Sequence, residues 1–309
     1  SINVLGQANF TSSSAATTQA GMFNPRGLTL DSANNRLFVA DDQNRRVTVY
    51  DVASITDGEN AINVLGQANF TSSSSATTQA GMTAPLGVAY DQANKVLFVG
   101  DYNSNRILSY SFTANSANNG PNANNALGQY SDETGTLAPV YTKSIVGNTP
   151  NRLGLYTPEG VIIDSVGHRL FVSDTFNNRV LVYNLNTSNQ LLDYIPDNVL
   201  GQADFVNNGV ATTSTGMRTP IGLAYDSTNQ RLFVADANNQ RILAYNLADG
   251  LTNGEVANGV LGQSSFTSNT NTTTATGLSG PYNLAYDSTN QRLFVADYTN
   301  NRVLAYNLA

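Results

Sequence analysis

The feature that most constrains the fold of this chain is a unit that appears five times along its 309 residues. Ile2–Met22 returns as Ile62–Met82 with a single difference, Ser75 in place of Ala15. The most regular part of the unit reads Arg-Leu-Phe-Val-Ala-Asp-x-x-Asn-x-Arg, and its aspartates follow one another at steps of 60, 73, 62 and 61 residues. Such self-similarity indicates an array of like structural units. We therefore predict one closed body of five units, although length alone would suggest about two domains.

The charge pattern argues against nucleic acid as a partner. Charged residues make up 12% of the chain, about half the usual share in globular proteins. The formal net charge is -7, and no run of lysine and arginine occurs. Binding to a phosphate backbone requires a basic patch, so we expect no nucleic-acid partner. The chain contains no cysteine, which excludes disulfides and thiolate metal sites.

The composition also bears on where the protein works. Asparagine, threonine, serine, alanine and glycine take the place of the missing charged residues, which suits a secreted or cell-surface bacterial protein. The sequence shows neither a signal peptide nor an apolar run of membrane length, so we expect no membrane insertion. A start at Ser1 fits removal of a leader or an anchor, while cytoplasmic residence stays open.

Each unit holds four short apolar runs separated by turn residues. In the fourth unit these runs are Gly222–Asp226, Leu232–Asp236, Arg241–Asn246 and Gly259–Gln263. They are short and rich in valine, leucine, isoleucine, phenylalanine and tyrosine, as strands are, and no segment shows a long helical period. Asp and Asn residues between the first two runs stabilise tight reversals. Radial repetition of such units predicts an all-β fold, a five-bladed β-propeller with four antiparallel strands per blade.

The predicted propeller is a single domain over residues 1–309. Its first-to-third strands are expected at about 26–51, 86–111, 159–184, 221–246 and 282–308. The chain opens with a fourth-type strand, Asn3–Gln7, and ends on a third-type strand, Arg302–Leu308. We therefore predict that the N-terminal strand completes the last blade and closes the ring, which leaves no open sheet edge.

The strand–turn–strand motif resembles the NHL repeat family. The best matches are Leu37–Tyr50, Leu170–Tyr183, Leu232–Tyr245 and Leu293–Tyr306. The added Asn-Val-Leu-Gly-Gln-x-x-Phe element, as at Asn63–Phe70, resembles bacterial, often extracellular, members of that group. NHL propellers are usually six-bladed, so five units leave the native blade number open. The family includes protein- and RNA-binding propellers and an amidating lyase, so the resemblance implies no single function.

Polar residues that recur in every unit are expected to be structural. Asp and Asn side chains can cap the turn between the second and third strands, and Arg can bridge carboxylates or carbonyls of the adjacent blade. Catalysis usually needs one asymmetric group, whereas these residues occur in all five units. The predicted structural residues are Asp41, Arg46, Asp101, Arg106, Asp174, Arg179, Asp236, Arg241, Asp297 and Arg302.

The sequence offers little metal or acid–base chemistry. His168 is the only histidine, and a zinc site needs several ligands brought together. We expect no cofactor, although a calcium ion in the channel, held by carbonyls and carboxylates, stays possible. Among acids outside the repeat pattern, only Glu159 falls at a predicted central position. One carboxylate does not make an acid–base pair, so we predict no catalytic residue.

Positions that vary inside the fixed frame are the candidate ligand-binding residues. They lie between Pro and Gly (or Asn) before the innermost strand, and at the tips of the turns between second and third strands. Aromatic groups at such tips can stack on sugars or pack against a partner. The predicted ligand-binding residues are Arg26, Leu86, Glu159, Ile221, Tyr282, Tyr102, Phe176 and Tyr298. The Tyr130–Thr157 connection, longer than the others, is the segment expected to confer specificity.

These observations favour a non-catalytic binding propeller that recognises a protein or a glycan through its loop-rich face. One alternative is a hydrolase or lyase that uses a channel metal and carboxylates. Another is an architectural spacer module of a larger surface protein.

Overall fold

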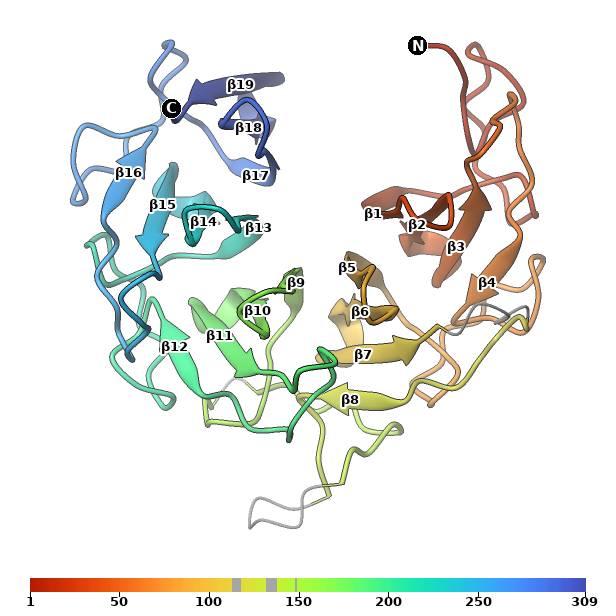
Figure 1. Cartoon of the computed structure of the whole chain (residues 1–309), viewed down its shortest axis with the longest axis horizontal. Coiled ribbons are helices and arrows are strands. Elements are labelled where there is room, and N and C mark those ends of the chain that lie inside the picture. Colours follow the sequence, from red (N-terminus) through yellow and green to blue (C-terminus); the bar gives the residue numbers. More distant parts are fainter. Residues whose placement is uncertain (113–117, 132–137, 148) are drawn as a thin grey trace. The chain divides into compact units, whose positions relative to one another are not determined.

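The computed structural model of the chain describes residues 1–112, 118–131, 138–147 and 149–309. Its described part is all-β apart from one-turn 3-10 helices, and its strands form five antiparallel sheets (Figure 1). These sheets are the blades of a five-bladed β-propeller, as the repeat predicts. No helix in the described ranges is long and apolar enough to cross a membrane.

The strands follow the repeat closely. The first blade consists of β1 (Pro25–Asp31), β2 (Arg36–Asp41), β3 (Arg46–Asp51) and β4 (Asn63–Leu65), and the second of β5 (Pro85–Asp91), β6 (Val96–Asp101), β7 (Arg106–Ser111) and β8 (Asn125–Leu127). The third consists of β9 (Pro158–Asp164), β10 (Arg169–Asp174), β11 (Arg179–Asn184) and β12 (Asn198–Leu200). The fourth consists of β13 (Pro220–Asp226), β14 (Arg231–Asp236), β15 (Arg241–Asn246) and β16 (Gly259–Leu261), and the fifth of β17 (Pro281–Asp287), β18 (Arg292–Asp297) and β19 (Arg302–Asn307).

Short 3-10 helices join the second and third strands of each blade. They are η1 (Asp42–Asn44), η2 (Tyr102–Ser104), η3 (Thr175–Asn177), η4 (Ala237–Asn239) and η5 (Tyr298–Asn300). Each ends in a residue with left-handed backbone geometry, for example Asn178 with a φ of 53°. Asparagine tolerates this conformation better than most residues, which explains its frequent use before the arginine of the motif.

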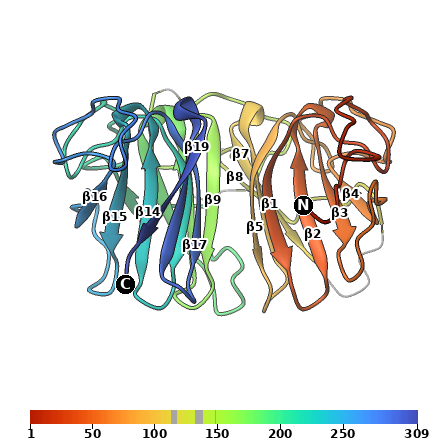
Figure 2. The same ribbon diagram turned by 90° about the horizontal axis from the view of Figure 1, so that it is seen from above.

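The chain divides into two compact units, Ser1–Ile145 and Val146–Ala309. The first unit contains the first two blades, and the second contains the other three. Within each blade the strands are neighbours in chain order, as the views of Figures 1 and 2 show. The single domain expected over residues 1–309 stays a prediction.

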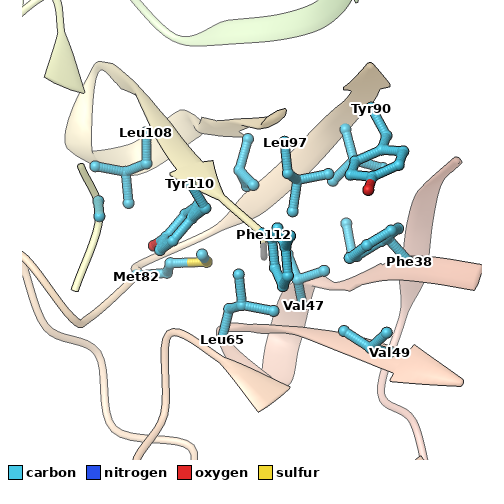
Figure 3. Packing of buried hydrophobic residues seen from close by; sticks show 14 of the residues in the cluster. Phe38, Val47, Val49, Leu65, Met82, Tyr90, Leu97, Leu108, Tyr110 and Phe112 are labelled. Atoms are coloured by element: carbon cyan, nitrogen blue, oxygen red, sulfur yellow. The ribbon is translucent and has the colours of Figure 1, made fainter. Parts of the chain in front are cut away.

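The core lies between neighbouring blades. In the first unit one face of blade one contributes Val47 and Leu65, and the facing side of blade two contributes Leu97 and Leu108; all four are at most 1% exposed (Figure 3). Burial of each such side chain contributes about 1.5–3 kcal/mol to stability. Along the strands of blade four, successive side chains face blade three and blade five in turn, so both faces of this blade are apolar.

A β-bulge opens the first strand of every blade. In blade two, Pro85 pairs with Asp101 and the next pair is Val88 with Val99, so the middle of Pro-x-Gly leaves the regular ladder. The glycine is required because a Cβ there would collide with a carbonyl oxygen of the following blade. The colliding pairs are Gly27 with Leu86, Gly160 with Ile221 and Gly222 with Tyr282. In the last blade Asn283 occupies this position, and it is exposed.

The structure differs from the sequence prediction at the last blade. Its sheet has three strands, β17-β18-β19, and Asn3–Gln7 forms no strand. Val303 on β19 is 67% exposed, whereas its counterpart Ile242 on β15 is fully buried. Closure of the ring by pairing of Asn3–Gln7 with the last blade stays a prediction.

The N-terminal segment nevertheless keeps the local contacts of a fourth strand. The backbone N–H of Val4 donates to Asp57 Oδ1 at 2.9 Å, and the Val4 carbonyl accepts from the N–H of Gly58 at 3.0 Å. Val199 makes the same pair of contacts with Asn253 and Gly254. One edge of Asn3–Gln7 is therefore held by a loop of its own unit, while its other edge takes part in no ladder.

Candidate functional site

The Pro-x-Gly bulges and the 3-10 turns lie at the same end of each blade. The reason is the antiparallel register, which places Pro220 opposite Asp236, the last residue before η4. The backbone N–H of Ala237 in that turn also donates to the carbonyl of Thr219, at 3.2 Å. Two kinds of candidate residue, the bulge centres and the turn tips, thus share one face in each unit.

The repeated aspartate lies beneath this face and accepts hydrogen bonds from groups of its own blade. Asp236 accepts from the backbone N–H of Arg218 at 2.6 Å, from Asn239 Nδ2 at 2.8 Å and from Arg241 Nε at 2.7 Å. Burial raises the pKa of the Asp236 carboxyl to about 6, although the Arg241 guanidinium acts in the opposite direction. Burial likewise raises the pKa of Asp174 in blade three.

The repeated arginine donates to three backbone carbonyls on two loops. In addition to Asp236, Arg241 donates through Nη2 to the carbonyls of Thr213 and Gly216, each at 2.9 Å, and through Nη1 to that of Phe266. Thr213 and Gly216 precede the blade, and Phe266 follows its fourth strand. The Arg241 side chain is fully buried, so its donors are directed at the loops of its own blade.

The same ion pair occurs in every blade. Its Nε–Oδ2 distances are 2.8 Å for Arg46–Asp41, 2.9 Å for Arg106–Asp101, and 2.7 Å for Arg179–Asp174 and Arg302–Asp297. Blade two has Ser104 where the others have asparagine, and Ser104 hydrogen bonds to Thr83. Side chains enclosed in this way present nothing to a ligand, which favours the structural role predicted for them.

Three of the predicted ligand-binding residues meet in the second unit. The Tyr282 hydroxyl donates to Glu159 Oε2 at 2.9 Å, and the Tyr282 ring lies 5.9 Å from that of Tyr298. Tyr282 and Glu159 are half-buried, whereas Tyr298 is 71% exposed. These residues come from blades three and five, and we refer to them as the Glu159–Tyr282–Tyr298 group. It combines a carboxylate with two phenol rings, one of them open to solvent.

Two further predicted residues of the second unit make other contacts. Phe176, 44% exposed, makes an edge contact with Tyr156 at 5.1 Å. Ile221 is half-buried, and its carbonyl oxygen lies close to Gly160.

The first unit contains the other three predicted residues. Arg26 is exposed, and its Nε lies 3.8 Å from Asp42 Oδ2. Leu86 and Tyr102 are half-buried, and the N–H of Tyr102 donates to the carbonyl of Ala84.

A further set of varied positions was missed by the sequence reasoning. It lies two residues before the proline of each bulge, and its backbone N–H donates to the repeated aspartate; its members are Phe23, Thr83, Tyr156, Arg218 and Ser279. Phe23 and Arg218 are exposed at the same end of their blades. The signal was present in the sequence, since five different residues stand at a fixed distance from the proline.

The long Tyr130–Thr157 connection is partly scaffold. Residues 132–137 and 148 lie outside the described residues. Arg106 Nη1 donates to the carbonyl of Tyr141 at 2.6 Å, as Arg46 does to that of Phe70. Tyr141 thus replaces the recurring phenylalanine, and the role predicted for this loop in specificity stays a prediction.

The described part of the chain contains no group of three or more His, Asp or Glu side chains that could hold a metal ion. His168 Nδ1 lies 2.6 Å from Asn189 Oδ1, away from the repeated aspartates. The possible channel calcium stays a prediction.

Comparisons with known proteins agree with this architecture. Residues 217–245 match the NHL repeat. Over 94% of its length the chain resembles a chain in the crystal structure of a nidogen/laminin complex, with a TM-score of 0.54 and 17% identity, and it covers 78% of that chain. No curated protein matches the sequence. The chain is therefore a β-propeller that contains an NHL repeat, and the bacterial subtype stays a prediction.

Proposed function

We propose that this chain is a non-catalytic binding propeller that recognises a partner protein through the Glu159–Tyr282–Tyr298 group and the turn tips beside it. The observation that carries the proposal is the contact among these three side chains at positions where the repeat requires no particular residue. Tyrosine is enriched at protein interfaces because it combines a large apolar surface with a polar tip. Tyr298 presents such a surface to solvent.

The burial pattern supports binding rather than catalysis. The acids and arginines of the motif are engaged with backbone groups, and within the described ranges no cluster of three acids or histidines is formed. Glu159 meets a tyrosine hydroxyl, which does not supply the second carboxylate of an acid–base pair.

A protein partner is favoured over a glycan by the comparison with solved structures. One solved structure whose fold resembles that of this chain is a nidogen/laminin complex. A sugar could also stack on Tyr298, so the test includes both ligand classes.

The experiment compares three purified proteins: the wild type, Tyr298→Ala, and the matched control Phe10→Ala. Phe10 is 54% exposed on an outer loop, so its loss removes a similar aromatic surface from another place. Each protein is immobilised and exposed to extracellular proteins and, separately, to a glycan array. We expect one protein to be retained by the wild type and by Phe10→Ala and lost with Tyr298→Ala. Retention of the same proteins by all three would contradict the proposal, and a Tyr298-dependent signal on glycans alone would replace the protein partner by a sugar.

A further inference from the structure

We infer that the Glu159–Tyr282–Tyr298 group binds a cationic side chain, an arginine or a lysine, of the partner. This inference rests on the proposed function and specifies the chemistry of its ligand. A carboxylate attracts a cation directly, and the faces of tyrosine rings attract it through their quadrupoles. The three side chains combine both attractions within one contact group.

The hydrogen bond from Tyr282 determines how the carboxylate is presented. The Tyr282 hydroxyl donates to Glu159 Oε2, which orients the carboxylate without neutralising it. Glu159 is half-buried, so its charge is less screened than that of a fully exposed glutamate. The same hydrogen bond holds the Tyr282 ring near that of Tyr298. A cation at the exposed ring of Tyr298 would therefore meet an oriented negative charge and an aromatic face together.

The first unit shows the same pairing of charges within the protein. There Arg26, at the bulge centre, lies 3.8 Å from the carboxylate of Asp42 at the turn tip. In the second unit the bulge centre of blade three is Glu159, with the opposite charge, and the turn tip of blade five is Tyr298. A partner's arginine at Glu159 would form a cation–carboxylate contact like the one that Arg26 and Asp42 form within the protein.

One positive group on the same face acts against a cationic ligand. Arg218 of blade four is exposed, and its backbone lies beside the repeated Asp236. Its side-chain charge would weaken the binding of another cation by repulsion. Removing the charge of Glu159 and removing that of Arg218 should thus change the affinity in opposite directions. Net charge alone would give the same two signs, so a local site is distinguished by comparing Glu159 with a glutamate on another loop.

The test uses hexaarginine and hexalysine peptides as probes, with hexaglutamine as the neutral reference, and measures dissociation constants by calorimetry at low and high salt. Glu159→Gln and Tyr298→Ala should each weaken hexaarginine binding by about tenfold. Arg218→Gln should strengthen it. The matched control is Glu255→Gln, which removes the same charge from a side chain that is also half-buried but lies on another loop, where Glu255 accepts from Thr252. This control should leave the affinity within about twofold, because a distant charge is screened.

Two results would overturn the inference. Equal losses for Glu159→Gln and Glu255→Gln would show attraction by net charge alone, and absence of binding by both cationic peptides would show that no such site exists. If a partner protein or glycan is still captured in a Tyr298-dependent way while both peptides fail, the inference falls and the proposed function stands. Circular dichroism of each variant checks that the fold is retained.

Discussion

Two sets of side chains occupy the same end of the blades and differ in almost every physical respect. The Asp–Asn–Arg set is nearly identical in each blade, bonded to the backbone of its own blade, and enclosed in the first four blades. The Glu159–Tyr282–Tyr298 group occurs once, reaches the surface, and joins blades three and five. Of these two sets, the one that recurs is mostly buried, and the one that occurs once includes a side chain open to solvent. Changes to the two sets should therefore separate stability from binding.

The largest effect is expected from breaking the buried ion pair. Arg241→Met keeps much of the side-chain volume but leaves the buried carboxylate of Asp236 without its guanidinium. Loss of one partner of such a pair should lower the free energy of unfolding by about 3–5 kcal/mol, measured by urea unfolding. Arg302→Met is the comparison, because the Arg302 side chain is 25% exposed and should cost less. Losses below about 1 kcal/mol at Arg241 would contradict a structural role.

The next effect concerns the approach of neighbouring blades. Gly222→Ala places a Cβ against the carbonyl oxygen of Tyr282, and such overpacking should cost about 1–3 kcal/mol. It should also move Tyr282, and so weaken ligand capture. Asn283→Ala is the matched control, because this exposed position already carries a Cβ. If both variants unfold at the same urea concentration, the close approach of the blades does not constrain the glycine.

A smaller effect should appear as a dependence of stability on pH. Burial opposes ionisation of Asp226, but hydrogen bonds from Asn229 and Arg231 outweigh it and hold the pKa of this carboxyl below its usual value. A lowered pKa in the folded state contributes stability that is present above the unfolded pKa and lost as the pH falls through the folded pKa. The difference in unfolding free energy between the wild type and Asp226→Asn should therefore shrink as the pH falls from 5 to 3. A difference independent of pH would refute the ionic contribution.

The smallest effect on stability is expected within the varied group. Tyr282→Phe keeps the ring and removes the hydroxyl that donates to Glu159. The free energy of unfolding should fall by about 0.5–1.5 kcal/mol, the net contribution of one hydrogen bond. Hexaarginine affinity should lie between those of the wild type and Glu159→Gln. An affinity equal to that of the wild type would mean that orientation of the carboxylate by Tyr282 does not matter.

The sequence alone predicted the repeated scaffold well. First-to-third strands expected at about 221–246 lie at Pro220–Asn246, because alternating apolar residues and turn residues determine strands locally. The pairing expected between Asn3–Gln7 and the last blade stays a prediction, because strand type is a local property whereas pairing depends on position in space.

The candidate site was predicted as positions and not as contacts. The varied positions were visible in the sequence, including Glu159, Tyr282 and Tyr298. The contact between Glu159 and Tyr282 was not, because 123 positions separate them and the half-buried Ile221 of the intervening blade occupies the equivalent position. The sequence did not predict the contact between the rings of Tyr156 and Phe176, because Tyr156 lies in the Tyr130–Thr157 connection.

The bulge glycine also restricts how such an array can grow in evolution. A duplicated unit inserted after the blade of Gly160 or Gly222 would pack against a backbone whose glycine leaves room for a neighbouring carbonyl oxygen. A unit inserted after the blade of Asn283 would meet a side chain at the corresponding place. We therefore expect an added unit to pack more readily beside a blade with a bulge glycine than beside that of Asn283, and we expect Asn283→Gly to ease such packing.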